Sequence, residues 1–305
     1  MNNQAEDSSF LQNRGFQYGV RHLLSPLNGT LEQVLEKSLG LTSDQTRALL
    51  HLGAIYLQGK RLNESAQQTE IKAQTYLRIH QTPRRFPIEK LNPTQCLVYE
   101  DDGLFIVNKP AGLPVHPSVD NIQENVLTLL KQFYQQPLFI THRLDVATEG
   151  LLVFAKTKEQ QSKINSAFES GLTKKFYRAL VHGQELPTGR WLHYMQPSPR
   201  APKTVSKTEQ AQWKTCQLDL FEQKKLGENQ SEVQIQLLTG RTHQIRAQLS
   251  CEGFPVIGDK AYGSNMQISE NEEICLQAYE LHLPTSPLEG AMLEFHLPRP
   301  PWPTN

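Results

Sequence analysis

An arginine and an aspartate stand two positions apart in the stretch HRLDVATEGLLVFAKT, immediately before an apolar run. The charges of Arg143 and Asp145 are costly to remove from water unless each is paired or used. An R-x-D pair by itself is more often a structural ion pair in a loop than a reactive site. A carboxylate held rigidly at the end of a buried strand can instead act as a nucleophile or a base. The rest of the sequence decides between these two interpretations.

Several other kinds of catalytic site lack their sequence signatures. The ten histidines lie far apart, and no H-x-H or H-x-x-x-H spacing suggests a metal site. The phosphate-binding pattern G-x-x-x-x-G-K-[ST], the dinucleotide pattern G-x-G-x-x-G and the nucleophile pattern G-x-S-x-G are all absent. We therefore expect neither a metal nor a cofactor, and a metal-dependent hydrolase is disfavoured.

Composition gives no overall sign of a polyanionic partner. Lys+Arg and Asp+Glu both total 31 among 305 residues, so a nucleic-acid-binding protein would have to concentrate its basic residues locally. The four cysteines form no C-x-x-C pair, which is typical of a reducing compartment. No apolar run approaches the length of about 20 residues that a membrane span needs. We expect a cytoplasmic, monomeric protein without a membrane segment.

Residues 29–80 carry the signals of a small domain with two helices and a hairpin. Two S/T-x-x-E/Q capping patterns, which begin at Thr30 and Thr42, precede apolar helical faces. The stretch IYLQGKRL then indicates a hairpin with its turn at Gln58-Gly59. A domain of this size buries only a small core.

The flanking segments complete the expected domain organisation. Residues 1–28 are polar and predict a flexible arm, and residues 81–96 contain three prolines and a basic pair, which is typical of a linker. We expect residues 97–305 to form a separate domain that folds without residues 29–80.

Short strands dominate the sequence beyond the linker. LVYEDDGLFIVNKP indicates two strands around an Asp-Asp-Gly turn, and GLLVFAKT, FYRALVHG and VQIQLL indicate three more. QQSKINSAFE and RTHQIRAQLS have the periodicity of helices. Because strands and helices do not alternate as in βαβ units, the pattern favours an α+β domain with a mainly antiparallel sheet.

Five motifs, in the same order along the chain, resemble those of the RluA-type pseudouridine synthase family, over about residues 97 to 298. They are VNKPAGLPVH (107–116), HRLDVATEGLLVFAKT (142–157), KKFY (174–177), TGRTHQIR (239–246) and GDKAYG (258–263). Residues 29–80 resemble, more weakly, the αL-type RNA-binding motif that often precedes this domain. The resemblance implies an α+β catalytic domain with a mixed, mainly antiparallel sheet, preceded by a small α/β RNA-binding domain. It also implies isomerisation of uridine to pseudouridine in ribosomal or transfer RNA.

The resemblance assigns three catalytic residues. Asp145 matches the family's reacting aspartate, which attacks C1′ or removes a proton from C2′; the sequence does not choose between these routes. Arg246 matches the arginine that pairs with that carboxylate. Tyr177 matches the tyrosine that stacks on the target uracil and assists proton removal from C5. The neighbouring Phe176 is the better candidate for a core aromatic residue.

The resemblance also predicts contacts with RNA. Arg143 matches the arginine that fills the stack left by a flipped base. Further basic residues are expected to contact phosphates. In the catalytic domain these are Lys109, Lys174, Lys175, Arg178, Lys203, Lys207 and Arg241. In the N-terminal domain they are Arg47, Lys60 and Arg61, although a small packing domain with little RNA affinity is the alternative there.

Three positions depart from the family pattern, namely Val146, Glu149 and Gln277. We expect Glu149 to add a negative charge near the site, which would weaken RNA binding locally or alter the choice of substrate. A non-catalytic RNA-binding protein that retains the fold is the alternative function, but it would have no use for a buried carboxylate that faces phosphates. The sequence does not identify the RNA or the uridine.

Overall fold

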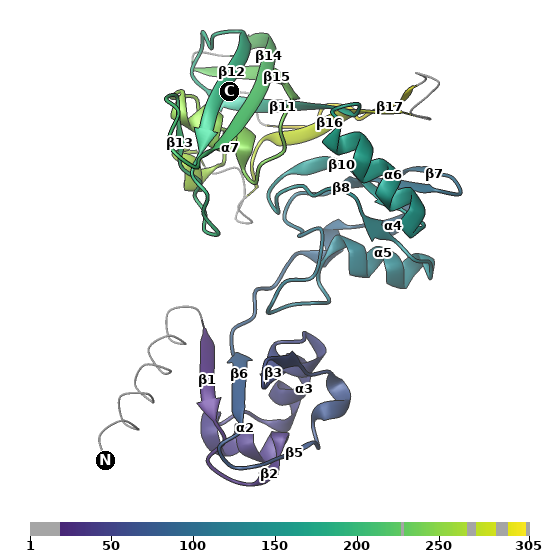
Figure 1. The fold of residues 1–305 in the computed structure, drawn as a ribbon, viewed down its shortest axis with the longest axis vertical. Helices are drawn as coiled ribbons and strands as arrows, with labels where there is room; N and C mark the ends of the chain where they lie inside the picture. Colours follow the sequence, from purple (N-terminus) through teal and green to yellow (C-terminus); the bar gives the residue numbers. More distant parts are fainter. Residues whose placement is uncertain (1–18, 227–228, 267–272, 285–291, 303–305) are drawn as a thin grey trace. The chain divides into compact units, whose positions relative to one another are not determined.

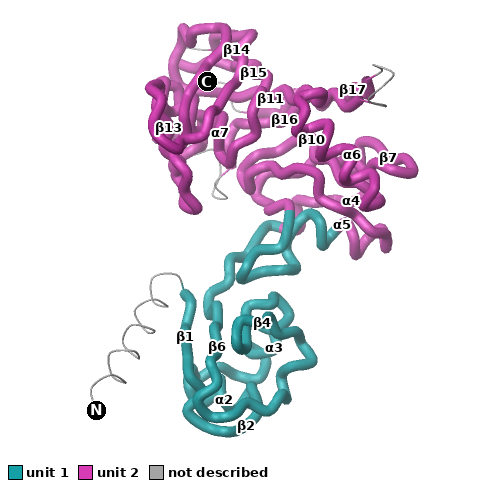
Figure 2. Tube along the Cα trace, viewed as in Figure 1, with its two compact units in different colours: residues 1–87, 116–129 teal, residues 88–115, 130–305 magenta. Residues whose placement is uncertain are grey.

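The computed structural model describes residues 19–226, 229–266, 273–284 and 292–302. The chain divides into two compact units, of which unit 1 comprises residues 1–87 and 116–129 and unit 2 comprises residues 88–115 and 130–305 (Figure 2). No helix in these described ranges combines the length and the apolar character needed to span a membrane. Each unit is considered by itself below.

Unit 1 contains two helices whose starts agree with the sequence prediction. Helix α2 (Leu31–Leu39) begins at Thr30, and helix α3 (Ser43–His51) begins at Thr42. Each threonine hydroxyl accepts a hydrogen bond from the backbone three residues later, and the glutamine there returns one to the threonine N–H. These reciprocal bonds satisfy backbone donors that the first helical turn leaves unpaired, which is why the pattern marks helix starts.

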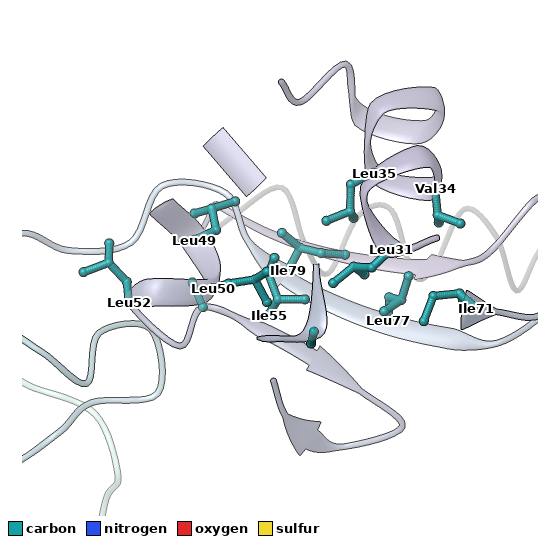
Figure 3. Close-up of a cluster of buried hydrophobic side chains, with 12 residues drawn as sticks. Leu31, Val34, Leu35, Leu49, Leu50, Leu52, Ile55, Ile71, Leu77 and Ile79 are labelled. Carbon is teal, nitrogen blue, oxygen red and sulfur yellow. The ribbon is translucent and has the colours of Figure 1, made fainter. Parts of the chain in front are cut away.

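A four-stranded sheet packs against these helices in unit 1. Its strands, in spatial order, are β1 (Val20–Leu24), β6 (Tyr76–His80), β3 (Ile55–Leu57) and β4 (Lys60–Arg61). The strands β2 (Gly29–Thr30) and β5 (Glu70–Ile71) form a separate pair, and η1 (Glu64–Ala66) is a short 3-10 helix. Leucines of both helices meet Ile55, Leu77 and Ile79 of the sheet in one apolar core (Figure 3).

The described part of the expected N-terminal arm is not a loose segment. Val20–Leu24 is strand β1, which pairs along its whole length with β6. The sequence of this segment has no clear periodicity, so it did not predict a strand. Strand β1 lies at the edge of the sheet and is held by its backbone pairing with β6. Residues 1–18 of the expected arm lie outside the described residues.

A segment from the middle of the chain completes unit 1, and the sequence did not predict it. Within residues 116–129, the Ile122 N–H donates to the Leu52 carbonyl oxygen at 2.9 Å, and the Tyr56 hydroxyl donates to the Val119 carbonyl oxygen at 2.7 Å. Gly53 allows this approach, since a Cβ at that position would lie 3.0 Å from the Ile122 side chain.

Two arginines in the expected linker bind the same segment. The Arg84 guanidinium forms hydrogen bonds with both carboxylate oxygens of Asp120, at 2.8 and 3.1 Å. Arg85 Nε donates to Glu124 Oε1 at 2.7 Å. The expected boundaries at residues 81–96 therefore differ from the compact units, because ion pairs far apart in sequence are invisible to local composition. A deletion of residues 29–80 would remove the partners of a segment that the rest of the chain retains.

Unit 2 is built on a mixed, mainly antiparallel sheet, in which eleven strands are seen among the described residues (Figure 1). The main path runs through β13 (Val205–Ser206), β12 (Gly189–Met195), β14 (Lys214–Leu226), β15 (Gln230–Leu237), β11 (Lys174–His182), β16 (Leu276–Pro284), β10 (Glu149–Ala155), β8 (Leu104–Lys109) and β7 (Leu97–Glu100). In addition, β17 (Met292–His296) pairs with β16, and β9 (Phe139–Ile140) pairs with β10. The predicted α+β class is confirmed.

The one parallel pairing among these described strands lies next to the HRLD segment. Strands β10 and β16 pair in parallel at Gly150 and Ala278. Gly150 has φ +121°, and a Cβ there would lie 2.3 Å from the Ala278 carbonyl oxygen. Only glycine permits both the backbone angle and the close approach. This glycine therefore fixes where the chain leaves the HRLD loop and enters the sheet.

Helices cover parts of the sheet in unit 2. They are α4 (Pro93–Cys96), α5 (Val126–Tyr134, whose first residues are assigned to unit 1), α6 (Lys158–Glu169) and α7 (Gln244–Cys251), with the 3-10 turns η2 (Ile88–Lys90) and η3 (Lys260–Tyr262). Ile164 of α6 packs on the apolar residues of β8 and β10. Ala247 of α7 packs on Met195 and Cys216 of β12 and β14. These contacts anchor α7, which carries Arg246.

Candidate active site

The aspartate of the HRLD segment lies in a tight loop that leads into β10. The Thr148 N–H donates to the Asp145 carbonyl oxygen at 3.1 Å, and the neighbouring Leu144 is buried. The Asp145 side chain is 19 % exposed, so its carboxylate is largely shielded but can still be reached. The loop therefore presents a carboxylate at the end of a buried strand, as the sequence predicted.

Lys109 holds this loop in place from inside the domain. Its ammonium donates to the carbonyl oxygens of Pro110, Leu113 and Val146, at 2.9, 2.8 and 3.1 Å. These three hydrogen bonds use all three ammonium protons. Because Val146 follows Asp145 directly, the ammonium fixes the backbone that carries the carboxylate.

The expected phosphate contact of Lys109 is therefore wrong. The side chain is 0 % exposed, and no phosphate could reach its ammonium without unfolding the loop. Burial lowers the pKa of Lys109 to about 7, although the negative charges of Asp145 and Glu149 oppose that fall. Lys109 is the last residue of β8, in the motif VNKPAGLPVH. Nothing in the sequence indicates that its long side chain points into the domain.

Arg246 lies beside Asp145, as the resemblance predicted. Its Nη1 is 3.4 Å from Asp145 Oδ2. The other edge of the guanidinium forms two shorter hydrogen bonds with Asp259, from Nε at 2.6 Å and from Nη2 at 2.9 Å. Asp259 is 1 % exposed, and Arg246 is also buried. Despite burial, which opposes it, the negative charges of Asp259 and Asp145 raise the pKa of Arg246, so its positive charge is permanent.

Asp259 is a site residue that was not assigned a role from the sequence, although it belongs to the GDKAYG motif. Its bidentate pairing leaves Arg246 little rotational freedom, because two parallel hydrogen bonds fix the plane of the guanidinium. Tyr262 of the same motif lies against the guanidinium, with Arg246 Cζ 4.9 Å from its ring centroid. The GDKAYG motif thus holds the Arg246 guanidinium of the TGRTHQIR motif in one fixed position.

His243 adds a second polar group beside the carboxylate. Its Nε2 is 3.9 Å from Asp145 Oδ1, and its Nδ1 is 3.0 Å from the Tyr262 hydroxyl. That hydroxyl accepts a hydrogen bond from the Lys203 N–H at 2.7 Å, so it can donate to His243 Nδ1. Burial lowers the pKa of His243, more than Asp145 raises it. The neutral ring then carries its proton on Nε2, on the side of Asp145.

Tyr177 lies in β11 and is 7 % exposed as a residue. Burial raises the pKa of Tyr177 well above its ordinary range, and the negative charge of Asp145 adds to this effect. The phenol is therefore protonated at neutral pH. The expectation that Phe176 is the core aromatic of this strand is reversed, since Phe176 is only half-buried and contacts Phe221 and His282.

The predicted RNA-binding residues of unit 2 fall into different environments. Arg143 and Arg241 are exposed, next to Asp145 and at the start of the α7 segment. Lys175 is half-buried with its ammonium 5.3 Å from the Phe168 ring centroid, and burial lowers its pKa. Lys174 is exposed. Both exposed arginines remain suited to contact a polyanion, and Arg143 is two residues from Asp145 in sequence.

Arg178 does not lie on the face that carries Tyr177. Adjacent residues of a strand point to opposite faces of the sheet. Its Nη2 donates to the Leu297 carbonyl oxygen at 3.2 Å, and its Cζ lies 4.1 Å from the Tyr279 ring centroid. The expected RNA contact of Arg178 at the site is therefore wrong, because one residue of register moves a side chain across the sheet.

Two further lysines expected to contact phosphates have protein partners. The ammonium of Lys203 donates to the Ser198 carbonyl oxygen. Lys207 forms an ion pair with Glu252 at 2.7 Å and is exposed. Both lie in the segment whose Lys203 N–H donates to the Tyr262 hydroxyl. Each ammonium already has a protein partner, so a phosphate would have to compete with it.

In unit 1, the three basic residues predicted from the sequence also differ. Lys60 is exposed, and Arg47 is exposed while it pairs with Asp44 at 3.4 Å. Arg61 is half-buried, and its Nη2 donates to the Tyr56 hydroxyl at 2.5 Å and to the Ser118 carbonyl oxygen at 3.0 Å. Arg61 therefore helps to hold the segment 116–129, and only the first two present their side chains to solvent.

The departures from the family pattern lie around the start of β10. The carboxylate of Glu149 accepts a hydrogen bond from Trp302 Nε1 at 3.1 Å. Burial raises the pKa of Glu149 above its usual value of 4.5. Gln277 pairs with Glu149 across the parallel strands and donates to the Pro298 carbonyl oxygen at 3.2 Å. Val146 is exposed, with its carbonyl held by Lys109. Glu149 is thus half-buried, with its carboxylate held by Trp302.

The fold and the Asp145–Arg246 arrangement define a class of RNA-modifying domain. Residues 103–251 match the family described as RNA pseudouridylate synthase. The chain is 30% identical over 218 residues to the dual-specificity RNA pseudouridine synthase RluA of Escherichia coli K12, an alignment that covers 69% of this chain and 98% of that protein. The chain therefore belongs to the RNA pseudouridylate synthase family, and the resemblance to its RluA-type members is confirmed.

A second relative and one solved structure agree with this assignment. RNA pseudouridine synthase 6, chloroplastic, of Arabidopsis thaliana is 37% identical over 214 residues, which cover 63% of this chain and 45% of that protein. The chain thus spans about half the length of this relative. The structure of human RNA pseudouridylate synthase domain containing 4 has a TM-score of 0.57 at 24% identity, over 70% of this chain and 91% of that one, which shows a shared fold.

Proposed function

We propose that this protein isomerises uridine to pseudouridine in structured RNA, with Asp145 as the reacting carboxylate. The observation that carries the proposal is the geometry around Arg246. Its guanidinium is locked by two short hydrogen bonds to Asp259 and makes a single long contact, of 3.4 Å, with Asp145. A fixed cation offsets the negative potential of nearby RNA phosphates and so favours the charged carboxylate. The long contact leaves the oxygens of Asp145 available for a reaction.

The reaction breaks the bond between N1 of uracil and C1′ of the ribose. The base then rotates, C5 bonds to C1′, the C5 proton is released to solvent and N1 takes up a proton, so that Asp145 is freed from C1′ or returns the C2′ proton. Asp145 can form a covalent bond to C1′, or it can remove a proton from C2′ to give a glycal intermediate. Both routes balance without an external electron donor or acceptor. Neutral His243, with Nε2 3.9 Å from Asp145 Oδ1, can orient its N–H dipole toward the carboxylate and so stabilise the negative charge that returns to Asp145 at the end of the reaction.

Tyr177 supports this chemistry as a neutral phenol. Because burial and the charge of Asp145 raise the pKa of Tyr177, the phenolate is scarcely populated at neutral pH and cannot serve as the base that removes the C5 proton. Its ring can stack on the uracil, and its hydroxyl can donate to a carbonyl of the base. We propose that the Tyr177 ring positions the uracil and that the Tyr177 hydroxyl, by hydrogen bonding to the base, assists the removal of the C5 proton.

Arg143 provides access to the base. A uridine in a folded RNA must leave its stack, at a cost of roughly a few kcal/mol. Arg143 is exposed two residues before Asp145 and has the planar guanidinium that can stack in the vacated space. Arg241 is exposed on a neighbouring segment and is assigned to phosphates, whereas Lys174 shares the sheet face of Phe176, opposite Tyr177, and is not assigned to them.

The substrate class belongs to the proposal as well. The RluA relative carries "dual-specificity RNA" in its name, and we propose ribosomal or transfer RNA for this chain. We propose that unit 1 contributes to RNA affinity through Lys60 and Arg47. Action as a monomer in the cytoplasm is part of the same proposal, and gel filtration with cell fractionation would test it.

Tritium release tests the activity directly. The full-length protein would be incubated with ribosomal and transfer RNA transcripts made with uridine tritiated at C5, and released label would be measured. We expect release to reach a whole-number ratio to RNA, with pseudouridine in the digested product. A protein that binds these RNAs tightly but releases no label from any of them would instead be a non-catalytic RNA-binding protein.

A further inference from the structure

A cluster of histidine and glutamate side chains lies on the antiparallel strands β16 and β17. Figure 1 shows where these two strands lie in unit 2. Glu280 is opposite His296 in the antiparallel register, and His282 is opposite Glu294. Alternate residues of a strand share a face, so these four side chains form a block on one face of the hairpin. The intervening Leu281 packs into the apolar core on the other side.

The donor atoms in this block converge. Ligand atoms of Glu280, His282 and His296 all lie within 4.8 Å of one another. His282 Nε2 is 2.6 Å from Glu280 Oε1, and His296 Nδ1 is 3.4 Å from Glu280 Oε2. Both oxygens of one carboxylate therefore face an imidazole nitrogen. Bonds of about 2.0 to 2.1 Å to a tetrahedral zinc ion place neighbouring donors roughly 3.4 Å apart. The His296–Glu280 pair already has this separation, whereas the hydrogen-bonded His282–Glu280 pair would open by less than about 1 Å on binding.

A carboxylate also faces the second nitrogen of His282. Glu294 Oε1 is 3.8 Å from His282 Nδ1. A histidine that binds a metal through one nitrogen usually donates its other N–H to a carboxylate, which fixes the ring and increases its basicity. Glu294 is 56 % exposed and can rotate to close this distance, whereas His282 is 15 % exposed and is held against Phe176.

We propose that Glu280, His282 and His296 bind a zinc ion, with Glu294 as the carboxylate that orients His282. Two imidazoles and one carboxylate favour zinc or a similar transition metal over magnesium or calcium, which prefer oxygen ligands. Three protein ligands leave a fourth position for water. The exposed Lys174 is opposite His282 on β11, and the two carboxylates outweigh its single charge.

This site is separate from the Asp145 centre. Phe176, which contacts His282, is adjacent in β11 to Tyr177 and so points to the opposite face of the sheet. The zinc ion would join β16 to β17 and stabilise the hairpin. The sequence predicted no metal, because His282 and His296 are far apart in sequence and become neighbours only through the strand register.

Zinc binding to the tag-free, full-length protein tests the proposal. After treatment with a chelator and its removal, the zinc content and affinity would be measured by mass spectrometry and by competition with a chromogenic chelator. We expect one zinc ion per chain, no displacement by excess magnesium, and a rise of the thermal unfolding midpoint that follows zinc concentration. A wild-type protein that binds no zinc would overturn the proposal.

Matched variants place the ion. The exposed His296→Ala should lose affinity by at least about 100-fold, and Glu294→Gln by about 10- to 100-fold, the usual effect of losing a carboxylate behind a ligand. His51→Ala is the control, since His51 and Glu64 form an exposed pair at 2.6 Å that no third histidine, cysteine or acidic residue joins among the residues that the structure describes. Wild-type affinity in His296→Ala, or equal losses in His51→Ala, would mean that zinc binds elsewhere.

Discussion

Two aspartates, one in each unit, bind an arginine in different ways. Asp120 of unit 1 accepts four hydrogen bonds: two from the Arg84 guanidinium, one from the Arg84 N–H at 2.9 Å and one from the Ser118 hydroxyl at 2.8 Å. Asp145 of unit 2 has one contact of 3.4 Å with Arg246. Although burial opposes ionisation, these bonds hold the pKa of Asp120 well below its usual range.

The difference separates a structural carboxylate from one available for chemistry. The lone pairs of Asp120 are occupied, so this residue can hold a segment in place but cannot attack a substrate. In unit 2 the short bonds of the arginine go to Asp259, and Asp145 receives the charge of Arg246 without being saturated by it. A reactive carboxylate needs a fixed cation near it and free oxygens of its own.

Apart from substitution of the Asp145 carboxylate itself, the largest effect around this comparison is expected from Arg246→Met. Removal of the fixed cation should lower the single-turnover rate on the order of 100- to 1000-fold, the usual loss for one preorganised electrostatic contact. RNA affinity should change by less than about tenfold, because Arg246 is buried. Rapid-quench measurement of the rate, with filter binding on the same samples, would check this.

Two controls make the Arg246 result interpretable. Arg241→Met removes an exposed charge from the same segment and should weaken RNA binding more than it slows the chemical step. Arg246→Lys keeps the charge but lacks the planar fork that binds Asp259. A single-turnover rate within a few-fold of wild type in Arg246→Met would remove this residue from the mechanism.

A smaller effect, on stability alone, is expected from Asp120→Asn. The loss of a charged partner for Arg84 should lower the free energy of unfolding by about 1 to 3 kcal/mol. Turnover at saturating RNA should stay within about threefold, as Asp120 has no role in the chemistry. Urea unfolding would measure the change. The control is Asp44→Asn, which removes the exposed ion pair with Arg47 and should lower the free energy of unfolding by less than about 1 kcal/mol. Equal losses in the two variants would contradict the structural role of Asp120.

The smallest effect is expected from Glu149→Gln, and it depends on pH. Burial raises the pKa of Glu149, so the folded state binds more protons than the unfolded state above the usual value of 4.5. The contribution of this group to stability therefore falls as pH rises through the folded pKa. The variant retains an oxygen that accepts from Trp302 and should be more stable than wild type at pH 7, by less than about 1 kcal/mol.

Unfolding experiments across a pH series would test this sign. The stability difference between Glu149→Gln and wild type should be small at pH 4 and grow towards pH 7. A difference that stays constant over this range, or that favours wild type more as pH rises, would mean that Glu149 ionises at least as readily in the folded protein as in the unfolded chain.

Local patterns in the sequence predicted the elements that local physics determines. The capping boxes at Thr30 and Thr42 and the turn at Gln58-Gly59 depend on residues within one turn of each other, and the structure contains them all. The buried strand after Asp145 is also present, because a continuous apolar run can only lie inside.

Side-chain direction and long-range pairing were harder to predict. Lys109 and Arg178 were expected to contact RNA because they are basic and belong to family motifs. The inward turn of the first and the strand register of the second reverse this conclusion. Asp259 and the segment 116–129 have partners that are distant in sequence. Charge alone therefore does not tell whether a residue faces a ligand or the protein interior.

The measurement that tests the central claim most directly is tritium release by Asp145→Asn. The substitution is nearly isosteric and removes the charge and the nucleophile, so the fold and RNA affinity should remain while the rate falls by about 10⁴-fold or more. Asp145→Glu should also fail, because the extra methylene displaces the carboxylate from a reacting geometry. If Asp145→Asn releases tritium at a rate comparable to wild type, Asp145 is not the reacting carboxylate.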